Sequence, residues 1–317
     1  MQSDARGLPG VTTAILSPQT IGIGAALLTV AIWGGWIVAT RYSAETALGP
    51  IDIGLFRYGP PAVLLAPIWW RIGLVPRNLS PGLLSLIIAG SGAPFLLVAA
   101  TGMRFAPAAE IGALLPGTMP LWAALIGCWL KTAHISRTQW LGYGLIAAGI
   151  AAIAAADFHG LAGVTNQTAQ SSSWIGHLSF IAAGALWAIY GHAFKRSGLT
   201  ALQAAGIVAA WSFLLHLLLA IIFGTAIWQV GAQIWLPQLL IQGGLSGLVA
   251  IIAYGIAIRR LGATRAASFS ALVPVLALLG GVVFLGETPQ RTSLLATVSV
   301  TIGVALASHI RRQRISG

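Results

Sequence analysis

The stretches AIWGGWIVATRYS at residues 31–43 and ALWAIYGHAFKRS at residues 185–197 share Ala, Trp, Ala and Ser at equivalent positions. Each also has a basic residue third from its end, Arg41 in the first and Lys195 in the second. The same offset joins further residues: Pro120 to Pro274, Gly127 to Gly281, Arg137-Thr138 to Arg291-Thr292, and Gly149 to Gly303. The chain therefore contains an internal repeat. Its architecture depends on whether that repeat faces water or lipid.

That solvent is indicated by the composition. Only 7% of the 317 residues are charged, against 57% hydrophobic, and the mean hydropathy is +0.88. Soluble domains carry about 25% charged residues, so we expect an all-α integral membrane protein whose partner is the lipid bilayer. The net charge of +11 does not favour nucleic acid as a partner, because the Lys and Arg residues are scattered between apolar runs.

Ten apolar runs are long enough to cross a hydrocarbon core, which takes about 20 residues. Their expected limits are 19–40, 52–70, 82–103, 111–130, 138–156, 174–194, 202–228, 236–257, 266–285 and 291–309. The polar segment 157–173 separates a first five-helix repeat at 19–156 from a second at 174–309. Residues 1–18 and 310–317 are expected to be terminal tails.

Because five is odd, the second repeat enters the membrane from the opposite side, which predicts inverted repeats. If both termini are cytoplasmic, the outer segments hold only Arg41, Arg104 and Arg291, and nearly all other Lys and Arg residues lie on the inner side. Cytoplasmic loops retain positive charge. We therefore expect a multi-pass protein of the bacterial inner membrane with both ends inside.

The stretch AYGIAIRRLGATRAASFSALVPVLALLGGVVFLGE at 253–287 resembles the signature of the EamA family in the drug/metabolite transporter superfamily. FAPAAEIGALLPGTMPLWAALIGCWL at 105–130 and LFRYG at 55–59 are the first-half equivalents. The first half departs from the pattern at Lys131-Thr132-Ala133, where Gly286-Glu287 would predict Gly-Glu. The resemblance implies a ten-helix carrier that moves small metabolites, such as amino acids or their derivatives, usually outward.

Aromatic residues deep in the spans are candidates to line a central substrate site. Trp33 and Trp36 share a helical face, as do Trp187 and Tyr190. Inversion places Trp36 in the outer third of its span and Tyr190 in the inner third, so we expect them to act as outer and inner gates. Packing within the bundle is the alternative for all four, and Tyr254 is a further candidate for the substrate site.

Prolines interrupt two of the expected spans, and the carbonyls that they free can bind a polar substrate beside a cavity. Pro116, Thr118 and Ser270 are the candidates for such contacts, and simple kinks that aid packing are the alternative. Arg57 lies inside the second span, where ionisable groups are costly. It either binds a carboxylate-bearing substrate or pairs with Glu110, and the pair is slightly favoured.

No acidic residue is expected deep in a span, which argues against a carboxylate proton relay as the coupling device. His192 and His216 are the candidates for proton coupling, and satisfied packing histidines are the alternative. No cofactor, metal set or catalytic constellation is expected. A membrane-embedded enzyme and a drug or amine efflux carrier remain the alternative functions, and both a monomer and a homodimer stay open.

Overall fold

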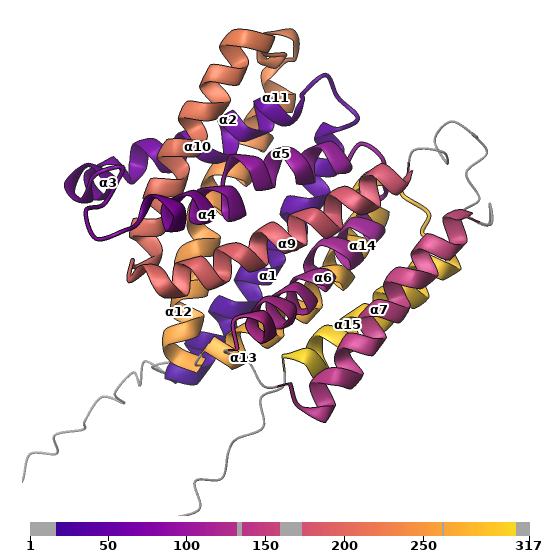
Figure 1. The fold of residues 1–317 in the computed structure, drawn as a ribbon. Helices are drawn as coiled ribbons and strands as arrows, with labels where there is room; N and C mark the ends of the chain where they lie inside the picture. Colours follow the sequence, from indigo (N-terminus) through magenta and orange to yellow (C-terminus); the bar gives the residue numbers. More distant parts are fainter. Residues whose placement is uncertain (1–16, 132–134, 159–172, 262, 309–317) are drawn as a thin grey trace, which may run out of the picture.

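The computed structural model describes residues 17–131, 135–158, 173–261 and 263–308 (Figure 1). Within these ranges every regular element is helical. The expected tails at 1–18 and 310–317 and the linker at 157–173 lie almost entirely outside the described residues. The fold is therefore all-α in the part of the chain that the structure describes.

The first half comprises α1 (Pro18–Ser43), α2 (Pro50–Leu64), α3 (Ala66–Ile72), α4 (Pro81–Ser91), α5 (Ala93–Gly102), α6 (Ala108–Trp129) and α7 (Arg137–Phe158). The second half comprises α9 (Ser173–Ser197), α10 (Ala201–Phe223), η1 (Ile227–Gln229), α11 (Ala232–Gln238), the π-helix η2 (Leu239–Val249), α12 (Ala250–Leu261), α13 (Ala263–Ser268), η3 (Phe269–Leu272), α14 (Val273–Leu285) and α15 (Arg291–Ala307). Several of these elements follow one another without a loop and together form longer rods.

Eight helical stretches among the described residues are long and apolar enough to cross a membrane. Two further segments fall short by that measure. One is α15, an apolar helix of 17 residues. The other is the rod of α2 and α3, which is interrupted at Leu65, just before Pro67. Pro67 has no backbone N–H to donate to Val63 O, and the N–H of Ile68 bonds Leu65 O, which explains the interruption.

The two halves pack in a symmetric way. α1 contacts α12 and α14, and its counterpart in the repeat, α9, contacts α5 and α6. α7 and α15 are also counterparts and lie side by side (Figure 1), with Ser299 Oγ donating to Leu145 O across the 154-residue offset at 2.8 Å. A helix that contacts its own counterpart lies next to the axis that relates the repeats, so α7 and α15 flank this pseudo-twofold axis.

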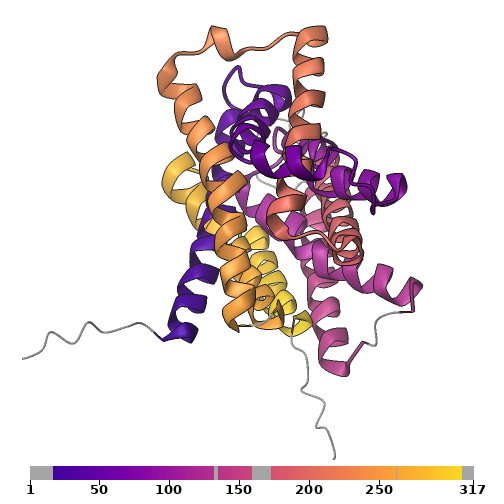
Figure 2. The same cartoon turned by 90° about the vertical axis from the view of Figure 1, so that its left-hand side faces the viewer.

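The two ends of the bundle differ in charge. The basic face, at the lower left of Figure 1, is where α1 begins and α15 ends, and Figure 2 shows the start of α1 beside the end of α12 there. We define this face by the basic residues at its helix ends: Arg71, Lys131, Arg137, Lys195, Arg196, Arg259 and Arg260. The opposite, acidic face is defined by Glu45, Asp52, Glu110 and Glu287. The site described next lies between the two faces.

Candidate functional site

A cavity of about 350 Å³ lies between the two halves. α1, α2, α9, α10, η2 and α12 all contribute to its wall. At one end its lining reaches Phe194, Ala201 and Ile258, which lie close to the ends of α9, α10 and α12 at the basic face. Among the sequence-predicted site residues, those that line it are Trp33, Arg57, Trp187, Tyr190 and Tyr254.

Aromatic rings form one side of this cavity. Trp33 meets Trp187 edge to face with 6.3 Å between ring centroids, and it meets Tyr254 at 5.3 Å. Trp187 also contacts Tyr190 at 5.5 Å. Trp33 and Trp187 are counterparts in the repeat, so their contact places the cavity on the pseudo-twofold axis. In inverted-repeat transporters the substrate site lies at the interface between repeats.

A second, smaller cavity of about 50 Å³ continues from the first, since both are lined by Trp33, Arg57 and Trp187. The predicted residues Trp36, Pro116 and Ser270 line this smaller cavity. Pro116 and Ser270 are counterparts in the repeat, like Trp33 and Trp187. Trp36 is only 5% exposed and stacks on Phe95 at a centroid distance of 6.2 Å. We call the cavity of about 350 Å³ the main cavity. The aromatic residues narrow the space where the smaller cavity continues from it.

The prolines and glycines of the sequence explain how Arg57 is positioned. Pro60 and Pro61 leave carbonyls of the preceding turn of α2 without their intrahelical donors. η2 approaches that turn closely, because a Cβ on Gly243 would lie 2.5 Å from Phe56 O and a Cβ on Gly247 would lie 3.0 Å from Arg57 O. The stretch GGLSG at 243–247 thus makes a contact between helices of the same chain, and Ser246 is brought to Arg57.

Arg57 does not pair with Glu110, so that favoured expectation is wrong. Arg57 Nη1 donates to Ser246 Oγ at 2.9 Å, and the guanidinium lies 4.9 Å from the centroid of the Trp36 ring. Glu110 lies in the first turn of α6 at the acidic face. There its Oε2 is 3.0 Å from His177 Nε2, and Ser293 Oγ donates to its Oε1 at 3.3 Å. The two residues are at different depths in the bundle.

Three predicted site residues lie outside the lining of both cavities. Thr118 is buried against Gly184 where α6 packs on α9, and its hydroxyl donates to Leu115 O. His192 Nε2 donates to Ala123 O at 3.0 Å. His216 is fully buried and donates from Nδ1 to Ser212 O at 2.7 Å, with its ring packed against Tyr58. Both histidines thus occupy helix–helix contacts.

Sequence reasoning missed several cavity residues. Ser246, Tyr58, Phe95 and Phe194 line the two cavities and were not predicted. Ser246 had an available signal, since it is the one hydroxyl within the small-residue stretch GGLSG. For the three aromatic residues, no feature of the sequence distinguishes a position in a cavity wall from ordinary packing.

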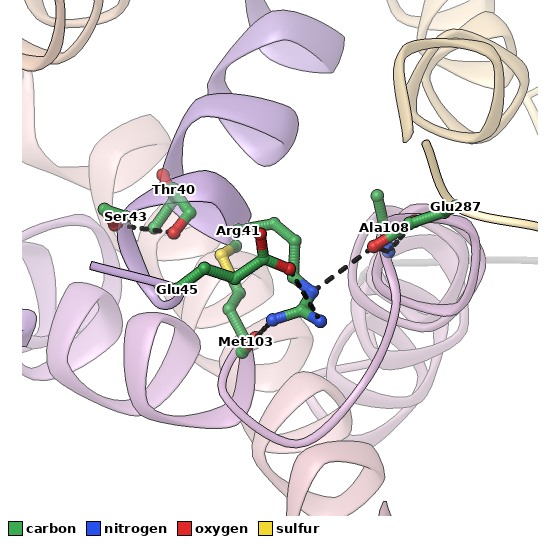
Figure 3. A network of polar contacts seen from close by, with 7 residues as sticks. All are labelled: Thr40, Arg41, Ser43, Glu45, Met103, Ala108 and Glu287. Carbon is green, nitrogen blue, oxygen red and sulfur yellow. Dashed lines mark hydrogen bonds and ion pairs between the residues drawn. The ribbon is translucent and has the colours of Figure 1, made fainter. Parts of the chain in front are cut away.

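Polar contacts close the acidic face of the bundle (Figure 3). Glu287, in the loop between α14 and α15, accepts from Arg41 Nε at 3.3 Å and from the backbone N–H of Ala108 at 2.9 Å. Arg41 also donates to Met103 O at 3.3 Å and pairs with Glu45 at 3.4 Å. We call these five residues the Arg41–Glu287 network. The network joins the end of α1 to the start of α6 and to the loop before α15, so it connects the two repeats.

Glu287 is well placed as an acceptor but partly desolvated. The backbone N–H of Ala108 lies at the N-terminus of α6, where helix N–H groups lack intrahelical partners and favour negative charge. Burial nevertheless raises the pKa of the Glu287 carboxyl above 4.5, and the hydrogen bond from Ala108 and the charge of Arg41 only partly offset that rise. The fully ionised network therefore carries a desolvation cost.

Comparison with known proteins agrees with this architecture. The model of the EamA-like transporter family matches residues 20–155 and again residues 174–309. The chain belongs to the EamA-like transporter family. The two matches coincide with the two halves seen in the fold, and this EamA protein is a membrane transporter of the drug/metabolite transporter superfamily.

Two relatives extend the comparison. The EamA protein is 26% identical over 299 residues to a probable terminal-alkyne amino-acid exporter of Streptantibioticus cattleyicolor, covering 92% of this chain and 94% of the relative. A protein solved by crystallography shares its fold with a TM-score of 0.59 at 22% identity, covering 92% of this chain and 96% of the other. The first relative supports transport, and the second supports the fold alone.

Proposed function

We propose that this protein is an alternating-access carrier that exports small amphipathic metabolites, amino acids or their derivatives, across the bacterial inner membrane. The observation that carries the proposal is the position of the main cavity. It lies on the pseudo-twofold axis, and it is lined by counterpart residues of the two repeats, Trp33 and Trp187. The amino-acid exporter among its relatives supports the same substrate class.

The proposal includes ten crossings of the membrane. α15 has 17 residues, which is the short end of the range for a spanning helix, about 17–25. α2 and α3 follow one another from Pro50 to Ile72 with one interruption, and broken helices occur where neighbouring protein satisfies the backbone. With these two segments added to the eight long stretches, each repeat has five crossings, and α1 begins and α15 ends at the basic face. We place that face in the cytoplasm, because cytoplasmic segments retain Lys and Arg.

We interpret the conformation as closed to the outside and accessible from the inside. The lining of the main cavity reaches the helix ends of the basic face, at Ala201 and Ile258. Toward the acidic face, the stack of Trp36 on Phe95 and the Arg41–Glu287 network stand in the path. Trp36 is then the outer gate, and Tyr190 takes the corresponding role at the inner side when the carrier turns outward.

The histidines take a structural role in this proposal. His216 packs against Tyr58 and Gly54, and His192 bonds a backbone carbonyl of α6. Neither lines either of the two cavities described above. We therefore propose that transport is driven by the substrate's own gradient or by coupling outside these side chains.

Counterflow in proteoliposomes tests the proposed function. Vesicles loaded with an unlabelled substrate should accumulate the labelled substrate faster than empty vesicles. Internal substrate lets the carrier return with its site occupied, which speeds the next uptake step. A channel gives uptake that is independent of internal substrate, and an enzyme gives a chemically altered product. Either result would refute the carrier.

A further inference from the structure

The main cavity contains a cation without a matching anion. Arg57 donates one hydrogen bond to Ser246 and lies over the Trp36 ring, and its other close neighbour is Tyr58, whose ring centroid is 6.0 Å away. The guanidinium has five N–H donors and stays protonated in proteins. A hydroxyl and two aromatic faces leave its charge uncompensated.

No acidic side chain lines either cavity in the described part of the chain. The ion pairs found among the described residues join Arg41 to Glu45, Arg41 to Glu287, and His177 to Glu110, and all of them lie at the acidic face. A buried charge without a partner is costly, and intramembrane charges commonly mark substrate pathways. The substrate is then the group that supplies the missing negative charge.

A second donor near Arg57 also lacks a protein partner. The indole Nε1 of Trp36 is buried and makes no hydrogen bond within the described residues. Trp36 lines the smaller cavity together with Arg57 and Ser246. Buried donors are nearly always satisfied in folded proteins, so an unpaired one beside a cavity calls for an acceptor from a ligand.

The rest of the main cavity suits an apolar body. The rings of Trp33, Trp187, Tyr190 and Tyr254 line it, and its volume of about 350 Å³ is at the small end for ligand pockets, roughly 300–1,000 Å³. An aromatic face attracts an ammonium group much less strongly than a carboxylate does. A free ammonium would therefore enter the cavity without a counter-ion while Arg57 repels it.

We propose that the cavity selects amphipathic carboxylates with one net negative charge, and that Arg57 is the residue that determines this specificity. This inference rests on the proposed transport function and narrows its substrate class. An N-acylated amino acid or a simple aryl or alkyl carboxylate meets the charge of the site. A zwitterionic free amino acid meets it less well, and an amine does not meet it at all.

Four compounds that share one phenyl body test the charge preference in purified protein. They are N-acetylphenylalanine and 3-phenylpropionate as anions, phenylalanine as the zwitterion, and 2-phenylethylamine as the cation. We expect both anions to bind at least about tenfold more tightly than phenylalanine, because the ammonium group of phenylalanine would be buried near Arg57 without an acceptor and neither anion carries such a group. The amine should show no saturable binding. The ratio between the two anions tells an acylated amino acid from a simple acid.

Substitution of Arg57 tests whether this residue determines the preference for anions. In Arg57→Gln the two anions should lose their advantage over phenylalanine, and in Arg57→Lys, which keeps the charge, part of it should remain. Arg291→Gln, an exposed arginine at the acidic face, is the matched control and should bind as the unchanged protein does. Size-exclusion profiles of Arg57→Gln and Arg57→Lys identify any variant that fails to fold.

Three results would overturn the inference: tighter binding of phenylalanine than of either anion, equal anion preference in a folded Arg57→Gln protein, or no binding of any of the four compounds. The proposed function fails separately. Selective anion binding without counterflow would keep the specificity of the site and reject the carrier.

Discussion

Arg41 and Glu287 are 246 positions apart in the sequence, yet Arg41 Nε lies 3.3 Å from Glu287 Oε1 at the acidic face (Figure 3). The counterpart residues in the repeat cannot form the same contact at the other face. Lys195 stands at the counterpart of Arg41, and Ala133 stands at the counterpart of Glu287, so the sequence supplies no carboxylate for an equivalent pair at the basic face. The hydrogen bonds that Glu287 accepts from Arg41 and from the backbone of Ala108, made at one face only, favour the conformation that is closed at that face.

Removing the shared acceptor should open the acidic face. In Glu287→Ala, Arg41 and the backbone N–H of Ala108 both lose an acceptor, and each buried group left unsatisfied costs about 1–3 kcal/mol. We expect the closed population to fall by about tenfold or more. Distances between spin labels at the exposed positions Tyr42 and Thr288 should then lengthen.

Glu45→Ala is the control for that experiment. Glu45 also contacts Arg41, at 3.4 Å, but its side chain is 50% exposed. Exposed pairs of this kind contribute about 0–1 kcal/mol. The label distances should stay as in the unchanged protein, and equal opening in the two variants would show that Glu287 has no special part in closure.

The pH dependence follows from the raised pKa of Glu287. Burial in the closed form raises this pKa above 4.5, whereas an open acidic face would expose the carboxyl to water and return the pKa to its ordinary value. The closed form therefore binds the proton more tightly, so acidification favours closure and the advantage is lost as pH rises through the raised pKa. Arg41 and Glu45 are the charged neighbours on this side.

The same pair of spin labels measures this effect. The open population should grow between acidic and neutral pH, and Glu287→Gln should flatten the response because no proton is then exchanged at this position. Growth of the open population on acidification would contradict the assigned sign.

Much of the architecture could be predicted from the sequence, and the repeat was the reason. The 154-residue offset and the hydropathy indicated two halves, and the family match covers both of them. Which side of each helix faces the cavity was harder to predict, because helices that are apolar all round carry little amphipathic signal. Thr118 accordingly lies against α9, while Ser246, which was not predicted, lines the cavity.

Contacts between distant segments were beyond sequence reasoning for a similar reason. The sequence slightly favoured a pair between Arg57 and Glu110, but the structure places Glu110 beside His177 and Ser293. The bond between Glu287 and the start of α6 depends on how the two repeats pack, which no local pattern encodes. The departure at Lys131-Thr132-Ala133 was a visible sign that the turn containing Glu287 has no equivalent in the first half.

The contact of α2 with α10 depends on one glycine. A Cβ added at Gly54 would collide with the ring of His216, which is fully buried. Gly54→Ala should destabilise the protein by about 1–3 kcal/mol, the usual cost of overpacking. Gly144→Ala on α7 is the control, since a Cβ there meets nothing within 4 Å. Thermal unfolding in detergent compares them, and equal midpoints would refute the contact.

The aromatic wall should matter for binding. Trp187→Ala removes the ring that contacts Trp33, Phe95 and Tyr190, and we expect substrate affinity to fall about tenfold, near 1.4 kcal/mol. Trp140→Ala, whose ring is 63% exposed and outside the cavity, should leave affinity unchanged. Titration monitored by isothermal calorimetry distinguishes them, and an equal loss in both would argue against the wall as a binding surface.

Reversible cross-linking of the acidic face tests alternating access most directly. In a Cys128→Ala background, Arg41→Cys with Glu287→Cys is joined by a cleavable bifunctional thiol reagent, and each single-cysteine variant serves as a control. The account predicts that cross-linked protein still binds substrate from the basic face, shows no counterflow, and regains counterflow when the link is cleaved. Full counterflow through completely cross-linked protein would contradict it.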